Sequence, residues 1–392
     1  MKDQNFVSIG AGNNQVPLIV AAKSLGYSVI AIDQNPNSSG FSLADTQIIS
    51  SIFDREFIIQ KLRNLENIAG LYSRSFGKAV EVANSIAKSF HLVSNSHSAL
   101  RFFRNKQKYK PILQSWQIPV PSDYKNATQY IIRPSTGYAK EGLRIVTIEE
   151  AKQFEPAQNN STSKDNGLQN IFIEPFIENT RECILLAFVI DGSFYPIVIT
   201  DRFRNHDFSD RMHVYPSILP AEVRYQMVEH CRRIVRRSKI MQGPFLAEFI
   251  IDQNNRPYLV ECAPEVGGEF LADDLVPAVL NLPYFELLIQ IYTKTNLDSI
   301  KRRLITLLEE PRSTSMVIGF SSAENSVTTS NGTQFSPQIY SHSGFYFARQ
   351  LPPPVLANSR PNSRRSKVIA LTGPIQERQS LIDSVEEFIK LK

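Results

Sequence analysis

Two apolar, strand-like runs in the second half of the chain each contain one glutamate. Residues 245–251 read FLAEFII and residues 257–262 read PYLVEC, so Glu248 and Glu261 both lie among apolar neighbours. The connecting DQNNR suits a short turn between antiparallel strands, and a turn centred near Asn254 sets the two glutamates almost opposite each other. Carboxylates that face each other at about 5 Å repel, so one of them must lose its charge or a cation must lie nearby.

The chemistry of this pair favours a hard cation. Oxygen ligands without histidine or cysteine suit magnesium better than zinc. We therefore expect Glu248 and Glu261 to bind Mg²⁺. The spacing alone leaves two alternatives open, a pair of solvent-exposed acids or a carboxylate neutralised by an arginine.

The composition is that of a folded, not a disordered, protein. The chain has 392 residues, 42% of them hydrophobic and 21% charged, which suggests two or three domains. A net charge of +5 is too small for this length to require nucleic acid. The three cysteines form no CxxC pattern, and we find no run of about 18 apolar residues. We expect a cytoplasmic protein with no nucleic-acid or membrane partner; a homodimer is the commonest assembly for such a chain.

The N-terminal region predicts an open parallel α/β domain. Residues 6–9 are strand-like, a glycine turn and a helix-like stretch follow, and residues 28–33 form a second strand pattern. The turn has Gly10 and Gly12 of G-x-G-x-x-G, with Asp33 about 20 residues further along. Because the last glycine is missing, a NAD-dependent oxidoreductase remains only a lesser alternative.

Cations and a glycine-containing loop precede the acidic pair. Lys106 begins the helix-like run NKQKYKPILQSWQ, and Arg133 lies in the strand-like YIIRPS. The following TGYAKEG contains Gly137 and Gly142, whose backbone freedom would let N–H groups approach phosphate oxygens. Next, the apolar IEPFI (residues 173–177) can form a wall for a purine ring, and a nearby acid can accept hydrogen bonds from ribose hydroxyls.

In this order the motifs resemble the ATP-grasp superfamily, specifically the carboxylate–amine (or thiol) ligase branch related to carbamoyl-phosphate synthase and biotin carboxylase. The resemblance runs from about residue 5 to residue 300 and rests on the segments GAGNNQVPLIVAAKSLGYSVIAID, NKQKYKPILQSWQIPVP, YIIRPSTGYAKEGLRIV, IEPFI, GPFLAEFIID and PYLVECAPEVGG. It implies an α/β domain over residues 1–102, an ATP-grasp fold of two α+β subdomains over 103–308, and a small α+β region over 309–392.

The resemblance also implies ATP and Mg²⁺ as cofactors. In such enzymes ATP phosphorylates a small-molecule carboxylate, and an amine attacks the acyl phosphate to give an amide or peptide-like bond, ADP and phosphate. Catalysis depends on positioning and charge neutralisation. By the same resemblance, Glu248 and Glu261 hold the metal, and the nucleotide is bound by Lys106, Arg133, Gly137, Gly142, Glu174, Phe176, Ile177 and Glu182.

Three positions depart from the family pattern. Arg133 replaces a lysine, and Ala263 stands where an asparagine often binds metal. Glu265 stands where many relatives have an arginine that stabilises the acyl phosphate. We expect another cation to compensate, with Arg202, Arg204 and Arg211 as candidates; alternatively, Glu265 could hold the ammonium group of an amino-acid-like substrate. A catalytically silent nucleotide-binding protein of the same fold is the alternative.

Overall fold

The computed structural model describes residues 4–134, 143–153, 171–178, 180–268, 270–322, 340–351 and 365–390. The predicted phosphate-loop glycines Gly137 and Gly142 lie outside the described residues, as does the polar connector 156–170. In the described part of the chain, no single helix is long and apolar enough to cross a membrane.

The N-terminal domain is built on the predicted parallel sheet. Its strand order is β3-β2-β1-β4, and apolar side chains from both faces of β1 enter two separate cores. Burial on both faces explains why these strands read as nearly continuous apolar runs. The elements are β1 (Asn5–Ile9), α1 (Val16–Ser24), β2 (Ser28–Asp33), β3 (Thr46–Ile49), α2 (Arg55–Leu62), β4 (Ile68–Tyr72) and α3 (Lys78–Ser89).

The glycine turn after β1 is stabilised by its own neighbours. Asp33 Oδ2 accepts a hydrogen bond from the backbone N–H of Ala11 at 2.9 Å. A Cβ atom on Gly10 would lie 3.1 Å from the side chain of Gln15, so that side chain covers the turn. The acid that suggested ribose binding therefore has a structural role, which weakens the oxidoreductase alternative.

The remaining strands form one large antiparallel sheet and one small sheet. The large sheet has the order β12-β11-β8-β9-β10-β13-β15-β14, so the C-terminal strands extend it directly. Its strands are β8 (Arg181–Ile190), β9 (Ser193–Arg204), β10 (Asp210–Tyr215), β11 (Gln242–Ile251), β12 (Pro257–Ala263), β13 (Thr314–Ser322), β14 (Phe345–Gln350) and β15 (Arg365–Pro374). The small sheet has the order β6-β5-β7 and consists of β5 (Gln129–Pro134), β6 (Arg144–Thr147) and β7 (Ile171–Phe176).

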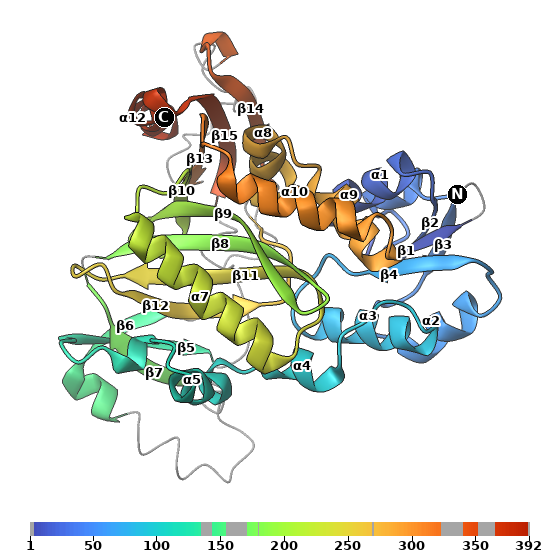
Figure 1. Cartoon of the computed structure of the whole chain (residues 1–392), viewed down its shortest axis with the longest axis horizontal. Helices are drawn as coiled ribbons and strands as arrows, with labels where there is room; N and C mark the ends of the chain where they lie inside the picture. The colour runs from blue at the N-terminus through green and yellow to red at the C-terminus, as the bar shows by residue number, and fades with distance from the viewer. Residues whose placement is uncertain are drawn as a thin grey trace.

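Helices cover both faces of the large sheet (Figure 1). Alternate residues of β8, such as Cys183 and Leu185, share a core with α4 (His97–Phe102), α5 (Lys106–Ser115) and α7 (Ala221–Ser238); we call this side the α7 face. The other residues of β8, such as Ile184 and Leu186, share a core with α1, α8 (Val276–Leu280), α9 (Tyr284–Thr293) and α10 (Leu297–Glu309); we call this side the α9 face.

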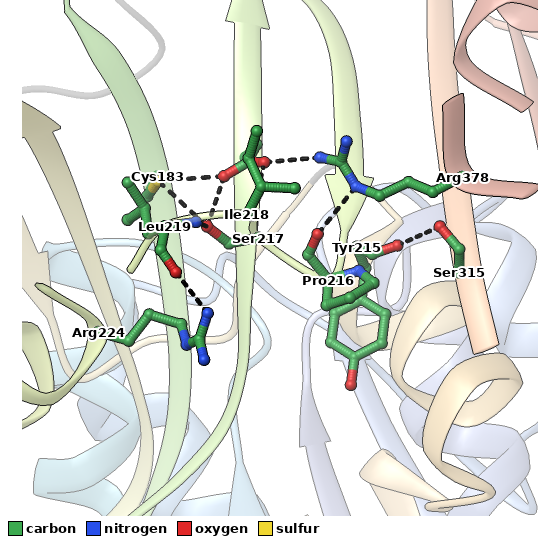
Figure 2. A network of polar contacts seen from close by, with 10 residues as sticks. Cys183, Tyr215, Pro216, Ser217, Ile218, Leu219, Arg224, Ser315 and Arg378 are labelled. Atoms are coloured by element: carbon green, nitrogen blue, oxygen red, sulfur yellow. Dashed lines mark hydrogen bonds and ion pairs between the residues drawn. The ribbon is translucent and has the colours of Figure 1, made fainter. Parts of the chain in front are cut away.

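A buried polar network holds the C-terminal helix α12 (Arg378–Lys390) to the large sheet. Figure 2 shows Arg378, whose guanidinium donates to Asp201 on β9 at 2.7 Å and to the carbonyl of Pro216 at 3.1 Å. Ser217 Oγ donates to the same aspartate at 2.5 Å. Since the partners of Asp201 come from distant parts of the chain, this network fixes the C-terminal region against the central strands.

We expect Gly243→Ala on β11 to destabilise the protein by about 2–5 kcal/mol, because positive φ and overpacking act together. Gly243 has φ +111°, and an added Cβ would lie 2.5 Å from Tyr292 Oη. Gly26→Ala is the control, because Gly26 has φ +85° but no atom of the described chain within 4 Å of the added Cβ. It should cost only about 1–2 kcal/mol. Denaturant unfolding measures the free energy of unfolding of both variants. An equal loss of unfolding free energy in Gly243→Ala and Gly26→Ala would contradict the role of the contact with Tyr292.

Candidate nucleotide and metal site

Glu248 and Glu261 face each other across β11 and β12, as the sequence predicted. They are direct register partners, and a bulge immediately after Glu248 shifts the pairing, so that Phe249 lies opposite Leu259. Glu248 also pairs with Ile184 of β8, whose side chain belongs to the core of the α9 face. Paired residues share a face of a sheet, so both carboxylates lie on the α9 face.

Each of the two carboxylates contacts a cation of the protein. Lys106 Nζ lies 2.6 Å from Glu261 Oε2, and Arg202 Nη2 lies 2.7 Å from Glu248 Oε2. The glutamate side chains remain 31% and 19% exposed, respectively. Arg202 therefore neutralises the charge of Glu248, which is one of the alternatives that the spacing left open.

The pair is also chemically suited to Mg²⁺. Within the described ranges, no group of three or more histidine, cysteine, aspartate or glutamate side chains could hold a metal ion, so this part of the protein supplies two carboxylate ligands here. Mg²⁺ commonly binds one or two carboxylates and completes its shell with phosphate oxygens and water. Glu248 and Glu261 fit that pattern if Lys106 turns towards the phosphates and leaves Glu261 to the metal.

Arg202 on β9 is the central cation of the site. Its side chain is 2% exposed, and Nη2 also lies 3.1 Å from Glu182 Oε2. Arg204 forms an ion pair with the same glutamate, and Asp210 lies 3.8 Å from Arg202 Nε. Burial opposes the charge of Arg202, but Glu248, Glu182 and Asp210 outweigh it and raise its pKa well above the usual value. Arg202 is therefore a permanent positive charge with a fixed orientation.

A buried charge triad connects helix α5 to the small sheet. Glu174 on β7 forms ion pairs with Lys110 and with Arg133, whose Nη1 lies 2.9 Å from Glu174 Oε1. Burial raises the pKa of Glu174, but the two cations prevail and hold it below its usual value. Burial lowers the pKa of Lys110 to about 8, although Glu174 opposes this shift. Arg133 thus faces Glu174 here, and the triad carries one net positive charge.

Sequence reasoning missed Lys110, although one signal was present. Lys110 lies four residues after Lys106, so one turn of α5 presents two lysines towards the same region. Ile177 and Phe176 were predicted to form part of a wall for adenine. Ile177 is 2% exposed, and the ring of Phe176 lies 6.5 Å from that of Phe208.

Glu265 lies at the junction of the two domains. Its Oε1 accepts a hydrogen bond from the backbone N–H of Gly77, immediately before α3, at 2.6 Å. The loop that carries it rests on the α9 face, because a Cβ on Gly267 would lie 2.5 Å from Leu186. Burial raises the pKa of Glu265 to about 7 against the Gly77 hydrogen bond, and Glu261 adds to the increase.

The structure does not bring Arg211 to this group. Its Nη2 lies 3.1 Å from Glu386 of α12, which packs on the α7 face. A register shift between Asp210 and Met212 breaks the alternation of β10 at this point. His213 instead pairs with Arg202 on the α9 face. Of the three arginines considered, Arg202 and Arg204 therefore lie in the acidic group around Glu182 and Glu248.

Comparisons with known proteins identify the domain and the fold. Residues 127–273 match the sequence profile of the ATP-grasp domain. No curated protein matches the chain significantly. Among solved structures, an L-amino acid ligase from Bacillus licheniformis has a TM-score of 0.75 at 17% identity, over 99% of this chain and 98% of that one.

Two further structures have the same fold. Phosphoribosylglycinamide synthetase from Anaerococcus prevotii has a TM-score of 0.71 at 15% identity, covering 98% of each chain. The biotin carboxylase domain of Hydrogenobacter thermophilus 2-oxoglutarate carboxylase, solved with MgADP and bicarbonate, has a TM-score of 0.71 at 13% identity, over 99% of this chain and 90% of that one. Residues 127–273 thus match the ATP-grasp domain, which agrees with the resemblance read from the motifs, and the chain shares the fold of these structures.

We predict that Glu265 makes stability fall as pH rises. Glu265 has a pKa of about 7 in the folded state and keeps its proton up to that pH, whereas an unfolded glutamate loses its proton near its ordinary pKa of 4.5. The unfolded state therefore binds fewer protons in this window, and the free energy of unfolding declines from about pH 4.5 to 7. Glu265→Gln should lack this decline, which amounts to at most roughly 3 kcal/mol at 1.36 kcal/mol per pKa unit.

Denaturant unfolding at pH 5 and pH 8 measures the difference between the two proteins. Glu222→Gln, on the exposed side of α7, is a matched substitution that should keep the wild-type profile. Parallel profiles for wild type and Glu265→Gln would contradict the prediction.

Proposed function

We propose that this protein is an ATP- and Mg²⁺-dependent ligase that phosphorylates a small-molecule carboxylate and joins the acyl phosphate to an amine, releasing ADP and phosphate. The observation that carries the proposal is the register pairing of Glu248 with Glu261, each in contact with a cation of the chain. Such an arrangement suits phosphoryl transfer, which requires positioning and charge neutralisation rather than a side-chain nucleophile.

In this proposal the charged residues have distinct roles. Glu248 and Glu261 would hold Mg²⁺, which neutralises the phosphates during transfer. Lys106 lies at the first position of α5 and would move its ammonium from Glu261 to a phosphate oxygen. The Lys110–Glu174–Arg133 triad has a net positive charge, which would attract the negatively charged phosphates of the nucleotide from the side of the small sheet.

Arg202 would replace the acyl-phosphate arginine that the chain lacks at position 265. A carboxylate oxygen of the substrate attacks the γ-phosphorus of ATP, and ADP leaves. The amine nitrogen then attacks the acyl carbon, the C–O bond to phosphate breaks, and phosphate leaves with the electron pair. Both steps develop negative charge on oxygen, and a buried guanidinium fixed by Glu182 and Asp210 can stabilise it without reorganising.

The similar structures support the same reaction class. They include proteins named as a ligase and a synthetase, and one was solved with MgADP. The catalytically silent alternative has one specific observation in its favour, since Glu265 is bound to Gly77 and adds a negative charge where a cation would help.

We expect ADP and phosphate to form only when a suitable acid and amine are both present. Glu248→Gln should lower kcat by roughly 100-fold or more, because it removes one carboxylate ligand from the charge-neutralising centre. Coupled detection of ADP over a panel of carboxylic acids and amines provides the measurement. Glu386→Gln is the matched control, because Glu386 lies on α12 and contacts Arg211 on the α7 face.

Two results would count against the ligase. Formation of AMP and pyrophosphate would exclude the acyl-phosphate route. Binding of ATP without turnover over the whole panel would favour the silent alternative.

A further inference from the structure

The buried triad of Lys110, Glu174 and Arg133 is asymmetric, because its two cations hold the carboxylate in different ways. Lys110 Nζ donates a hydrogen bond to Glu174 Oε2. Arg133 Nη1 lies 2.9 Å from Glu174 Oε1, but this ion pair lacks the alignment of a hydrogen bond. A charged hydrogen bond is stronger than an unaligned contact, so Lys110 is the firmly bound partner of the glutamate and Arg133 the loosely bound one.

The guanidinium of Arg133 has donors that its surroundings do not use. Its side chain is 10% exposed, and among the residues that the structure describes, neither Nε nor Nη1 has a hydrogen-bond partner. Buried N–H groups without an acceptor are rare because they are costly, and a bound ligand is one way to satisfy them. Arg133 is the last residue but one of β5, so the oxygens of a phosphate held after this strand would be suitable acceptors.

Glu174 needs a cation at all times. Its side chain is 3% exposed, and that of Lys110 is 4% exposed. Leaving one charge of a buried pair uncompensated is strongly unfavourable. Without Lys110, a move of Arg133 to a phosphate would take away the cation that remains in the triad. With Lys110 in place, the same move leaves a neutral, hydrogen-bonded Lys110–Glu174 pair.

The two cations also share an aromatic ring. Phe172 on β7 is buried, and its ring centroid lies 5.1 Å from Lys110 Nζ and 5.9 Å from the guanidinium carbon of Arg133. After a move of Arg133, Lys110 would still lie over this ring. Both contacts of Arg133 with β7, the carboxylate and the ring, would therefore keep a cation.

We propose that Lys110 is a positioning residue for the nucleotide: by compensating the charge of Glu174, it allows Arg133 to exchange that carboxylate for a phosphate group of ATP. The inference rests on the proposed function and adds a residue that acts without touching the nucleotide. Glu174 and the phosphates compete for Arg133, and Lys110 weakens the carboxylate in this competition. Lys110 thus governs the affinity for the nucleotide rather than the rate of the chemical steps.

The test compares the affinity for MgATP in two single variants and in their combination. Isothermal titration calorimetry on the full chain at pH 7 gives Kd, and circular dichroism shows whether each variant is folded. We expect Lys110→Met to raise Kd by about 10-fold or more, because Glu174 then retains Arg133. Glu174→Gln removes the competing charge and should lower Kd. The double variant Lys110→Met/Glu174→Gln should return to within about threefold of the wild type.

The pH dependence of Kd provides a second measurement, which a merely structural role of Lys110 would not affect. Burial lowers the pKa of Lys110 to about 8; Glu174 opposes the decrease, and Arg133 and Lys106 add to it. Cys262 on β12 also senses the charge of Lys110, but burial raises the pKa of this thiol well above its usual range, so it stays neutral. As the pH rises through 8, Lys110 loses its charge and Glu174 retains Arg133. Kd should therefore increase from pH 7 to pH 9 in the wild type, and this increase should be absent from Lys110→Met.

Lys301→Met is the matched control, because Lys301 on α10 also forms an ion pair, at 2.7 Å with Asp191 in the turn between β8 and β9. It should keep the wild-type Kd. An unchanged Kd in folded Lys110→Met would overturn the inference and leave the ligase proposal intact. The same holds if the double variant binds as weakly as Lys110→Met, because the effect would then not pass through Glu174.

Two further outcomes do not depend on the folding of a variant. A constant Kd of the wild type between pH 7 and pH 9 would overturn the inference even if Lys110→Met failed to fold. Absence of MgATP binding by the wild type would defeat the ligase proposal and this inference together.

Discussion

The repulsion between Glu248 and Glu261 is the constraint on which the site depends. Two carboxylates paired across neighbouring strands need positive charge close by, and the chain provides it from two directions. Lys106 comes from the start of α5, and Arg202 comes from β9 of the same sheet. The acidic pair therefore contacts cations from two separate elements of the chain. Because two neighbouring carboxylates require positive charge, the same position would also favour the binding of a divalent cation.

Helix α5 connects this acidic pair with the buried triad. Lys106 contacts Glu261, and Lys110, one turn later, contacts Glu174 on the small sheet. Removing one partner from a buried ion pair is costly because the other charge is left uncompensated, whereas the intact pair adds little net stability. The triad is thus better understood as a device that fixes the orientation of α5 against the small sheet than as a source of stability.

The sequence predicted local features well and long-range contacts poorly. The facing glutamates followed from apolar neighbours and a short turn, and the parallel sheet followed from strand, glycine turn, helix and strand. By contrast, the hydrogen bond between Glu265 and Gly77 joins residues 188 positions apart, and no local pattern encodes it. The position of Arg211 could not be predicted for a different reason. Strict alternation along β10 would place its side chain on the α9 face, but a single register shift between Asp210 and Met212 breaks that alternation.

Glu265 affects the electrostatics of the α9 face, because its carboxylate is hydrogen-bonded to the N-terminal domain. The loop that carries Glu265 binds the N-terminal domain and brings no positive charge to the site. In the proposed reaction, the positive charge that stabilises an anion would come from the sheet itself, where Arg202 is buried, charged and fixed by acidic neighbours. Because Arg202 lies on a rigid strand, its distance from the acidic pair is set by the spacing of the strands.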